Sequence, residues 1–143
     1  MTSDSRLGSQ AARVGAAVTT HAVVWIDQHT AHVLHVRPDA FDAAQIATPT
    51  HLHHRHPKGA GHAKEHPDDA KRFFHDVAGS LADVERLLVV GPSTAKLGFV
   101  RYLHAHDTAL EAKLVGVETV DHPTDPQLAA YARSYFDLDV GRD

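Results

Sequence analysis

The chain of 143 residues contains no cysteine, which excludes disulfide bonds and thiolate metal sites. It also lacks any run near the roughly 20 apolar residues that are needed to span a bilayer. The first 20 residues contain no apolar core of the signal-peptide type, and we interpret them as a flexible lead-in. These absences suit a reducing compartment, and we expect a cytoplasmic location without membrane association.

The chain also lacks an excess of positive charge. Its formal net charge is -4 with histidine neutral, so the overall basic field that is typical of nucleic-acid-binding proteins is absent. The charge is unevenly distributed, however. Residues 51–72 contain five basic and three acidic side chains, and six of the 14 histidines lie within residues 51–66. Protonation of some of these histidines would make this segment a local cation.

The first third of the chain favours β-strands. Residues 22–27 form a short apolar run, and residues 31–37 alternate, with Val33 facing one side and Leu34 and Val36 the other. Separated by a plausible turn, these segments predict a β-hairpin. Residues 43–48 predict a weaker third strand that ends at Pro49. Residues 49–66 follow neither period and predict a long exposed loop.

The remainder alternates between helices and strands. Pro67 suits the first turn of a helix, and apolar residues then recur at helical spacing to Leu81. The runs at 87–90 and 114–117 predict two strands buried on both faces, each followed by a helix. The apolar residues expected to hold these last two helices on the sheet are Leu97, Val100, Tyr102 and Leu103, and then Leu128, Tyr131, Ala132, Tyr135 and Phe136.

The order β-β-β-α-β-α-β-α predicts one α/β domain over residues 21–137, with a mixed five-stranded sheet and helices packed on its faces. Residues 138–143 are expected to form a frayed tail. The aromatic residues fit core positions, so we do not interpret them as a platform for stacking bases.

Several motifs resemble a known family. They are Val24-Trp25-Ile26-Asp27, the histidine-rich loop, the run Phe73-Phe74-His75-Asp76-Val77-Ala78, residues 88–96 and residues 115–125. Over residues 22–136 the chain resembles the middle domain of the archaeal and eukaryotic class-1 peptide-chain release factor and of Pelota. It is still more similar to a small bacterial family described as translational machinery proteins. The resemblance implies a ribonuclease-H-like topology and association with the ribosome or RNA.

The release-factor loop that contains Gly-Gly-Gln corresponds here to Pro57-Lys58-Gly59-Ala60-Gly61-His62. This stretch has neither adjacent glycines nor a glutamine, and His62 lies near the glutamine position. The resemblance therefore does not extend to peptide-release catalysis, and we assign no catalytic residue.

The histidine-rich loop allows three interpretations. Its cations could contact phosphate while its glycines let the backbone approach closely. Its imidazoles could instead bind zinc or another divalent metal, although their spacing matches no standard site. It could also be a solvated loop of biased composition. The RNA-binding candidates are Arg55, Lys58, Gly59, Gly61, His62, Lys64, His53, His54 and His56, and the metal candidates are His51, His53, His54 and His56.

Residues 91–96 join a predicted strand to a helix. Ser93 or Thr94 could cap this helix, and with Lys96 they form a possible anion site, although the P-loop pattern is absent. Asp27, Asp76 and Asp121 could converge to hold metal ions for phosphodiester hydrolysis. We interpret Asp121 and His122, which are adjacent in sequence, as parts of a structural turn.

The leading hypothesis is a translation-associated module that binds the ribosome or structured RNA through the basic loop, without sequence-specific DNA binding. The alternatives are a metal-dependent nuclease using Asp27, Asp76 and Asp121, and a metal-binding protein using the histidines of the loop. The sequence leaves the oligomeric state open.

Overall fold

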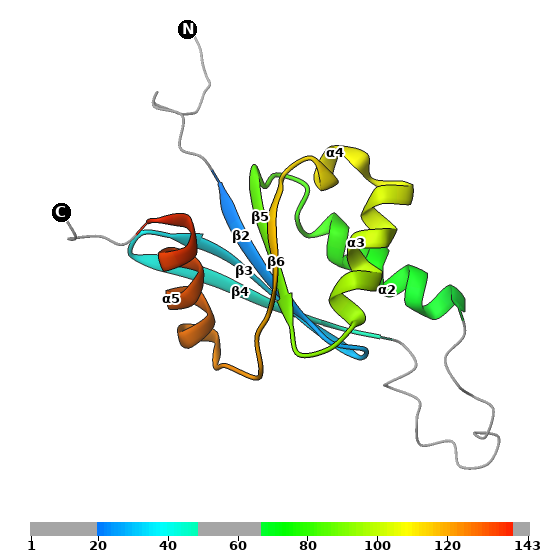
Figure 1. Ribbon diagram of the computed structural model, residues 1–143, viewed down its shortest axis with the longest axis horizontal. Helices are drawn as coiled ribbons and strands as arrows, with labels where there is room; N and C mark the ends of the chain where they lie inside the picture. The colour runs from blue at the N-terminus through cyan, green and yellow to red at the C-terminus, as the bar shows by residue number, and fades with distance from the viewer. Residues whose placement is uncertain (1–19, 49–66, 139–143) are drawn as a thin grey trace, which may run out of the picture.

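The computed structural model describes residues 20–48 and 67–138 (Figure 1). Predictions that fall on residues 1–19, 49–66 and 139–143 lie outside these ranges. The strands are β2 (His21–Ile26), β3 (Thr30–Arg37), β4 (Ala40–Ala47), β5 (Arg86–Gly91) and β6 (Leu114–Thr119). The helices are α2 (Pro67–Gly79), α3 (Ala95–His106), α4 (Thr108–Glu111) and α5 (Asp125–Phe136). None of the helices in the described ranges is long and apolar enough to cross a bilayer.

The five strands form one mixed sheet in the order β4-β3-β2-β5-β6, which confirms the predicted fold class. Strands β2, β3 and β4 are antiparallel neighbours, whereas β5 is parallel to both β2 and β6. The predicted third strand begins earlier than expected, at Ala40. Pro38 and Asp39 occupy a turn, and the chain pairs with β3 again directly after it.

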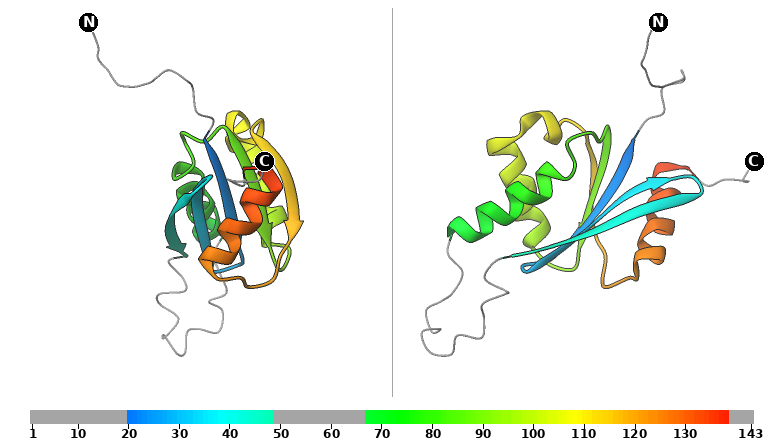
Figure 2. Two further views of the ribbon diagram at one scale, coloured as in Figure 1. Left: turned by 90° about the vertical axis from the view of Figure 1, so that its left-hand side faces the viewer. Right: turned by 180° about the vertical axis from the view of Figure 1, so that it is seen from behind.

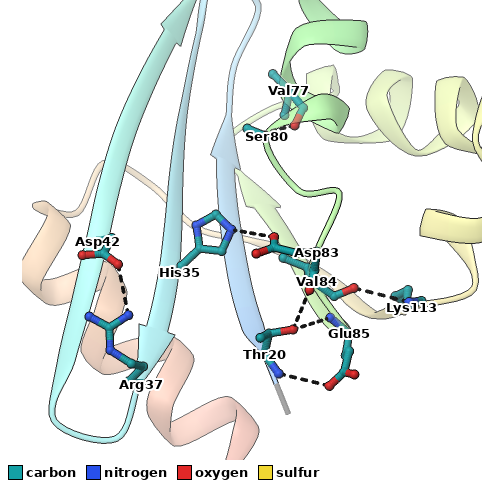
Figure 3. Close-up of polar contacts among 10 residues, drawn as sticks. All are labelled: Thr20, His35, Arg37, Asp42, Val77, Ser80, Asp83, Val84, Glu85 and Lys113. Carbon is teal, nitrogen blue, oxygen red and sulfur yellow. Dashed lines mark hydrogen bonds and ion pairs between the residues drawn. The ribbon is translucent and has the colours of Figure 1, made fainter. Parts of the chain in front are cut away.

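The helices cover the two faces of the sheet, with α2 and α3 on one face and α5 on the other (Figure 2). Successive side chains of a strand point to opposite faces. Val24 and Ile26 accordingly pack in the core beneath α2 and α3, whereas Trp25 packs in the core beneath α5. The amino end of β2 is held by Thr20, whose hydroxyl donates to the Asp83 carbonyl (2.8 Å) and accepts from the Glu85 amide (3.0 Å; Figure 3).

The central strands β2 and β5 approach closely where β5 ends. A Cβ atom on Gly91 would lie 2.2 Å from the carbonyl oxygen of Ile26. Gly91 is itself buried and accepts a backbone hydrogen bond from Val120 (3.0 Å). This position therefore requires the absence of a side chain, and it joins β2, β5 and the end of β6.

Strand β6 differs from the prediction of a second buried strand, because it is the edge of the sheet. Val115 is 37% exposed, and the face toward α5 is covered at Gly116 by the Tyr135 ring. A short apolar run does not reveal whether a second strand will flank it. The short helix α4 was not predicted.

In two helices the buried residues agree only in part with the prediction, which was right for Leu103 in α3 and for Leu128 and Ala132 in α5. In α3 the buried residues are Lys96, Phe99 and Leu103, whereas the predicted core residue Leu97 is 44% exposed. In α5 the buried residues are Leu128, Ala129 and Ala132, while Tyr131 and Tyr135, which were also predicted to pack against the sheet, are 37% and 39% exposed. The helical spacing of apolar residues was recognised in both α3 and α5. Which side of each helix faces the sheet was predicted only in part.

Gly91→Ala is expected to lower the free energy of unfolding by at least about 2 kcal/mol, because the new methyl group forces β2 and β5 apart. Gly79→Ala is the matched control, since a Cβ there would meet nothing within 4 Å. Its stability should be unchanged or higher by up to about 1 kcal/mol. Chemical denaturation of both variants measures the difference, and equal stabilities would contradict the close approach.

Partial burial raises the pKa of the Tyr135 phenol, and the hydrogen bond that this phenol donates to Glu118 (3.2 Å) raises it further. A raised pKa favours the protonated phenol in the folded protein, so this contribution to stability is lost as the pH rises through that pKa. Glu118→Gln removes the charge and should lower the pKa of Tyr135 toward about 10. An ultraviolet titration checks this, with Tyr135→Phe identifying the transition, and an unshifted transition in Glu118→Gln would contradict it.

Candidate functional site

The carboxyl ends of the parallel strands β2 and β5 lie at the same edge of the sheet. In open α/β sheets this edge is the usual place for a ligand site. A pocket of about 170 Å³ opens here between the sheet and the first turns of α2 and α3. It is lined by Asp27, Gln28, Thr48, Asp69, Ala70, Phe73, Phe74, Thr94 and Ala95.

The pocket lies at the base of the histidine-rich segment. Thr48 is the last described residue before this segment, and α2 begins directly after it. Thr48 is 5% exposed, and its amide donates to the His29 carbonyl (2.9 Å). Both ends of segment 49–66 are thus attached to rigid elements beside one pocket.

The predicted RNA-binding and metal-binding residues of this segment lie outside the described residues. They are His51, His53, His54, Arg55, His56, Lys58, Gly59, Gly61, His62 and Lys64. Their roles stay predictions, and the structure supplies the two points where the segment joins the domain.

The possible anion site at 93–96 is described. Of the two predicted caps, Ser93 and Thr94, it is Thr94 that occupies the N-cap position of α3. Its side chain makes no capping hydrogen bond. Lys96 is 8% exposed, and its ammonium donates to the Ser93 carbonyl (2.6 Å). The cation is therefore directed to its own backbone turn, and anion binding at Ser93, Thr94 and Lys96 stays a prediction.

The three aspartates of the nuclease hypothesis do not converge. The Asp27 carboxylate accepts hydrogen bonds from the His29 and Thr30 amides (both 2.8 Å) and so shapes the β2–β3 turn. Asp76 is exposed on α2, while the Asp121 carbonyl accepts from the Trp25 indole on the opposite face of the sheet. Within residues 20–48 and 67–138, no three metal-ligating side chains of the His, Cys, Asp or Glu type form a group. The three-aspartate metal site of the nuclease hypothesis is therefore wrong.

A polar cluster that the sequence did not predict surrounds Trp25. The ring centroids of His32 and His122 lie 5.5 and 4.9 Å from the indole centroid. Each imidazole Nδ1 lies beside a carboxylate, His32 beside Asp125 (3.1 Å) and His122 beside Asp121 (3.0 Å). These contacts attach the β6–α5 connection to the sheet. The interpretation of 121–122 as a structural turn agrees with this, although the two residues do form a hydrogen-bonded pair.

Comparisons with solved structures identify the class of fold. The chain is similar to part of Pelota from Archaeoglobus fulgidus, with a TM-score of 0.59 and 16% identity over 83% of this chain. It is also similar to Dom34 from S. cerevisiae, described as a translation termination-like factor (TM-score 0.53, 7% identity, 84% of this chain). For the archaeal translation termination factor aRF1 the TM-score is 0.50, with 15% identity over 83% of this chain.

These likenesses show that the protein has the fold of a Pelota and release-factor domain. The chain spans only 32% of the length of Pelota, 35% of Dom34 and 40% of aRF1. No family model matches the sequence, and no curated protein matches it.

Lys96→Met is expected to lower the free energy of unfolding by about 1–3 kcal/mol, because the Ser93 carbonyl loses a charged hydrogen-bond donor. Lys113→Met is the control. Its ammonium lies 3.4 Å from the Val84 carbonyl (Figure 3), and its loss should cost less than about 0.5 kcal/mol. Thermal unfolding compares the two. Unchanged stability of Lys96→Met, combined with weaker phosphate binding, would show that Lys96 serves an external anion instead.

Proposed function

We propose that this protein is a translation-associated module that contacts the ribosome or structured RNA through segment 49–66, and that it does not catalyse peptide release. The observation that best supports this is the attachment of both ends of the segment beside one pocket at the carboxyl edge of the sheet. Because both attachment points belong to the folded domain, the two ends of the segment are already positioned before a partner binds.

The composition of the segment suits a phosphate backbone. Arg55, Lys58 and Lys64 supply permanent positive charge, and Gly59 and Gly61 permit close approach of the backbone. His53, His54, His56 and His62 add charge when they are protonated. The remainder of the chain is acidic, so electrostatic attraction to RNA would orient this segment toward the partner.

The fold supports the same context. The solved proteins that share it include a translation termination factor and a translation termination-like factor. Membership of the small bacterial family of translational machinery proteins, and a cytoplasmic location, belong to this proposal. The Gly-Gly-Gln sequence of the release-factor loop is absent here, which is why release catalysis is left out.

The proposal predicts that the protein sediments with ribosomes and that Arg55→Ala/Lys58→Ala/Lys64→Ala does not. Removal of three phosphate contacts should weaken ribosome binding by at least about tenfold at moderate salt. The binding that remains should depend less steeply on salt concentration. The charge-matched control is Arg86→Ala/Arg101→Ala/Lys113→Ala, which removes three cations from outside the segment.

Equal loss of sedimentation in both triple variants would show that net charge, and not the segment, determines binding. If neither the wild-type protein nor the control variant sediments with ribosomes, the proposal is rejected. Repetition with zinc and with a chelator tests the histidines. If only the zinc-loaded protein sediments, His51, His53, His54 and His56 act as a metal site that organises the segment.

A further inference from the structure

Strand β4 is an unusually regular edge strand. Its eight residues pair with β3 in one continuous register, from Ala40 opposite Arg37 to Ala47 opposite Thr30. The other edge, β6, is shorter, contains a register shift, and is partly covered by Tyr135. Natural proteins usually interrupt or charge an exposed edge, because its unpaired backbone groups can pair with another strand.

The direction of each backbone group on β4 follows from one hydrogen bond. The Thr48 amide donates to the His29 carbonyl (2.9 Å), one step beyond the last pair of the β3–β4 ladder. Hydrogen-bonded pairs alternate along an antiparallel ladder. Residues 40, 42, 44 and 46 therefore bond to β3, whereas Phe41, Ala43, Gln45 and Ala47 direct their N–H and C=O groups away from it.

The side chains of β4 do not prevent another strand from approaching. The strand contains no proline or lysine. Four of its eight residues are alanine, and two of these, Ala43 and Ala44, lie at its exposed centre. Its only charge, Asp42, is already paired with Arg37 on β3 (3.0 Å; Figure 3). An added strand would thus meet small, uncharged side chains at the centre of β4.

We propose that β4 pairs with β4 of a second copy of this chain, antiparallel about a two-fold axis at Ala43. Such pairing keeps like faces together and joins outward-directed residues, with Ala43 opposite Ala43 and Phe41 opposite Gln45 of the second copy. On the other face, Asp42 lies opposite Ala44 of the second copy. The two carboxylates are not opposed, as they would be in the register centred on Asp42.

This pairing would produce one continuous ten-stranded sheet, twice the five strands of each copy. Because the two strands are antiparallel, the Thr48 residues lie toward opposite ends of the joined edge. The two copies of segment 49–66 would therefore begin on opposite sides of the two-fold axis. The dimer is independent of ribosome binding, since no residue of the segment takes part in it.

Analytical ultracentrifugation of the full chain over a range of concentrations tests the proposal, with Ala43→Pro as the disrupting variant. Proline at 43 removes an outward N–H that β3 does not use, so the hairpin is retained. The dimer dissociation constant should rise at least about tenfold, because both copies lose a hydrogen bond at the axis. Ala43→Val, which keeps the N–H, is the control and should dimerise like the wild type.

Amide exchange provides a second readout that does not depend on a variant. The proposal predicts that the amides of Phe41, Ala43 and Gln45 become protected as the protein concentration rises, while Asp42 and Ala44 are protected throughout. A protein that is monomeric with these three amides exposed overturns it. So does a monomer in which they are protected, since the edge is then covered by this chain itself, and so does a dimer that Ala43→Pro leaves intact.

Discussion

The parallel pairing of β2 with β5 is the contact on which the rest of the structure depends. It joins the antiparallel half of the sheet, built from one stretch of the sequence, to the half built from strand–helix units. The pairing is close enough at Gly91 to exclude a Cβ atom. Since both strands are buried along nearly their whole length, each face of this pair forms the centre of a hydrophobic core.

The same pairing determines where the candidate site lies. Because β2 and β5 run in the same direction, the β2–β3 turn and the start of α3 meet at one edge of the sheet. Thr48 reaches this edge because β4 runs antiparallel to β3 and so ends beside the β2–β3 turn. The base of segment 49–66 is therefore positioned by the sheet, and the polar cluster around Trp25 secures the β6–α5 connection on the opposite face.

Local patterns predicted the elements of this fold, but not all of their environments. Residues 31–37 alternate because one strand faces two different cores, and this was visible in the sequence. The runs at 87–90 and 114–117 both lack polar side chains, yet only 87–90 is central, since the strand order is fixed by distant contacts. The burial of Lys96 was missed for a different reason, because its partner is the Ser93 carbonyl in the adjacent turn, and a lysine in the sequence does not reveal which backbone group it will bond to.

The site was less predictable than the fold. Whether Asp27, Asp76 and Asp121 meet depends on which face of the sheet each occupies, and adjacency to strands does not reveal this. His32 and Asp125 are 93 residues apart in sequence, so no local sequence pattern could predict their contact. The basic and histidine-rich composition of residues 49–66, in contrast, was evident from the sequence alone.

In the function that we propose, segment 49–66 is the surface that meets RNA. The most direct measurement places a photo-crosslinking amino acid at His54 and, in a second protein, at Arg101 on the exposed side of α3, and irradiates each with purified ribosomes. We predict crosslinks to ribosomal or transfer RNA from position 54 and none from position 101. Crosslinks that form at position 101 and not at position 54 would contradict this proposal. Crosslinks from position 54 that reach protein but no RNA would also contradict it.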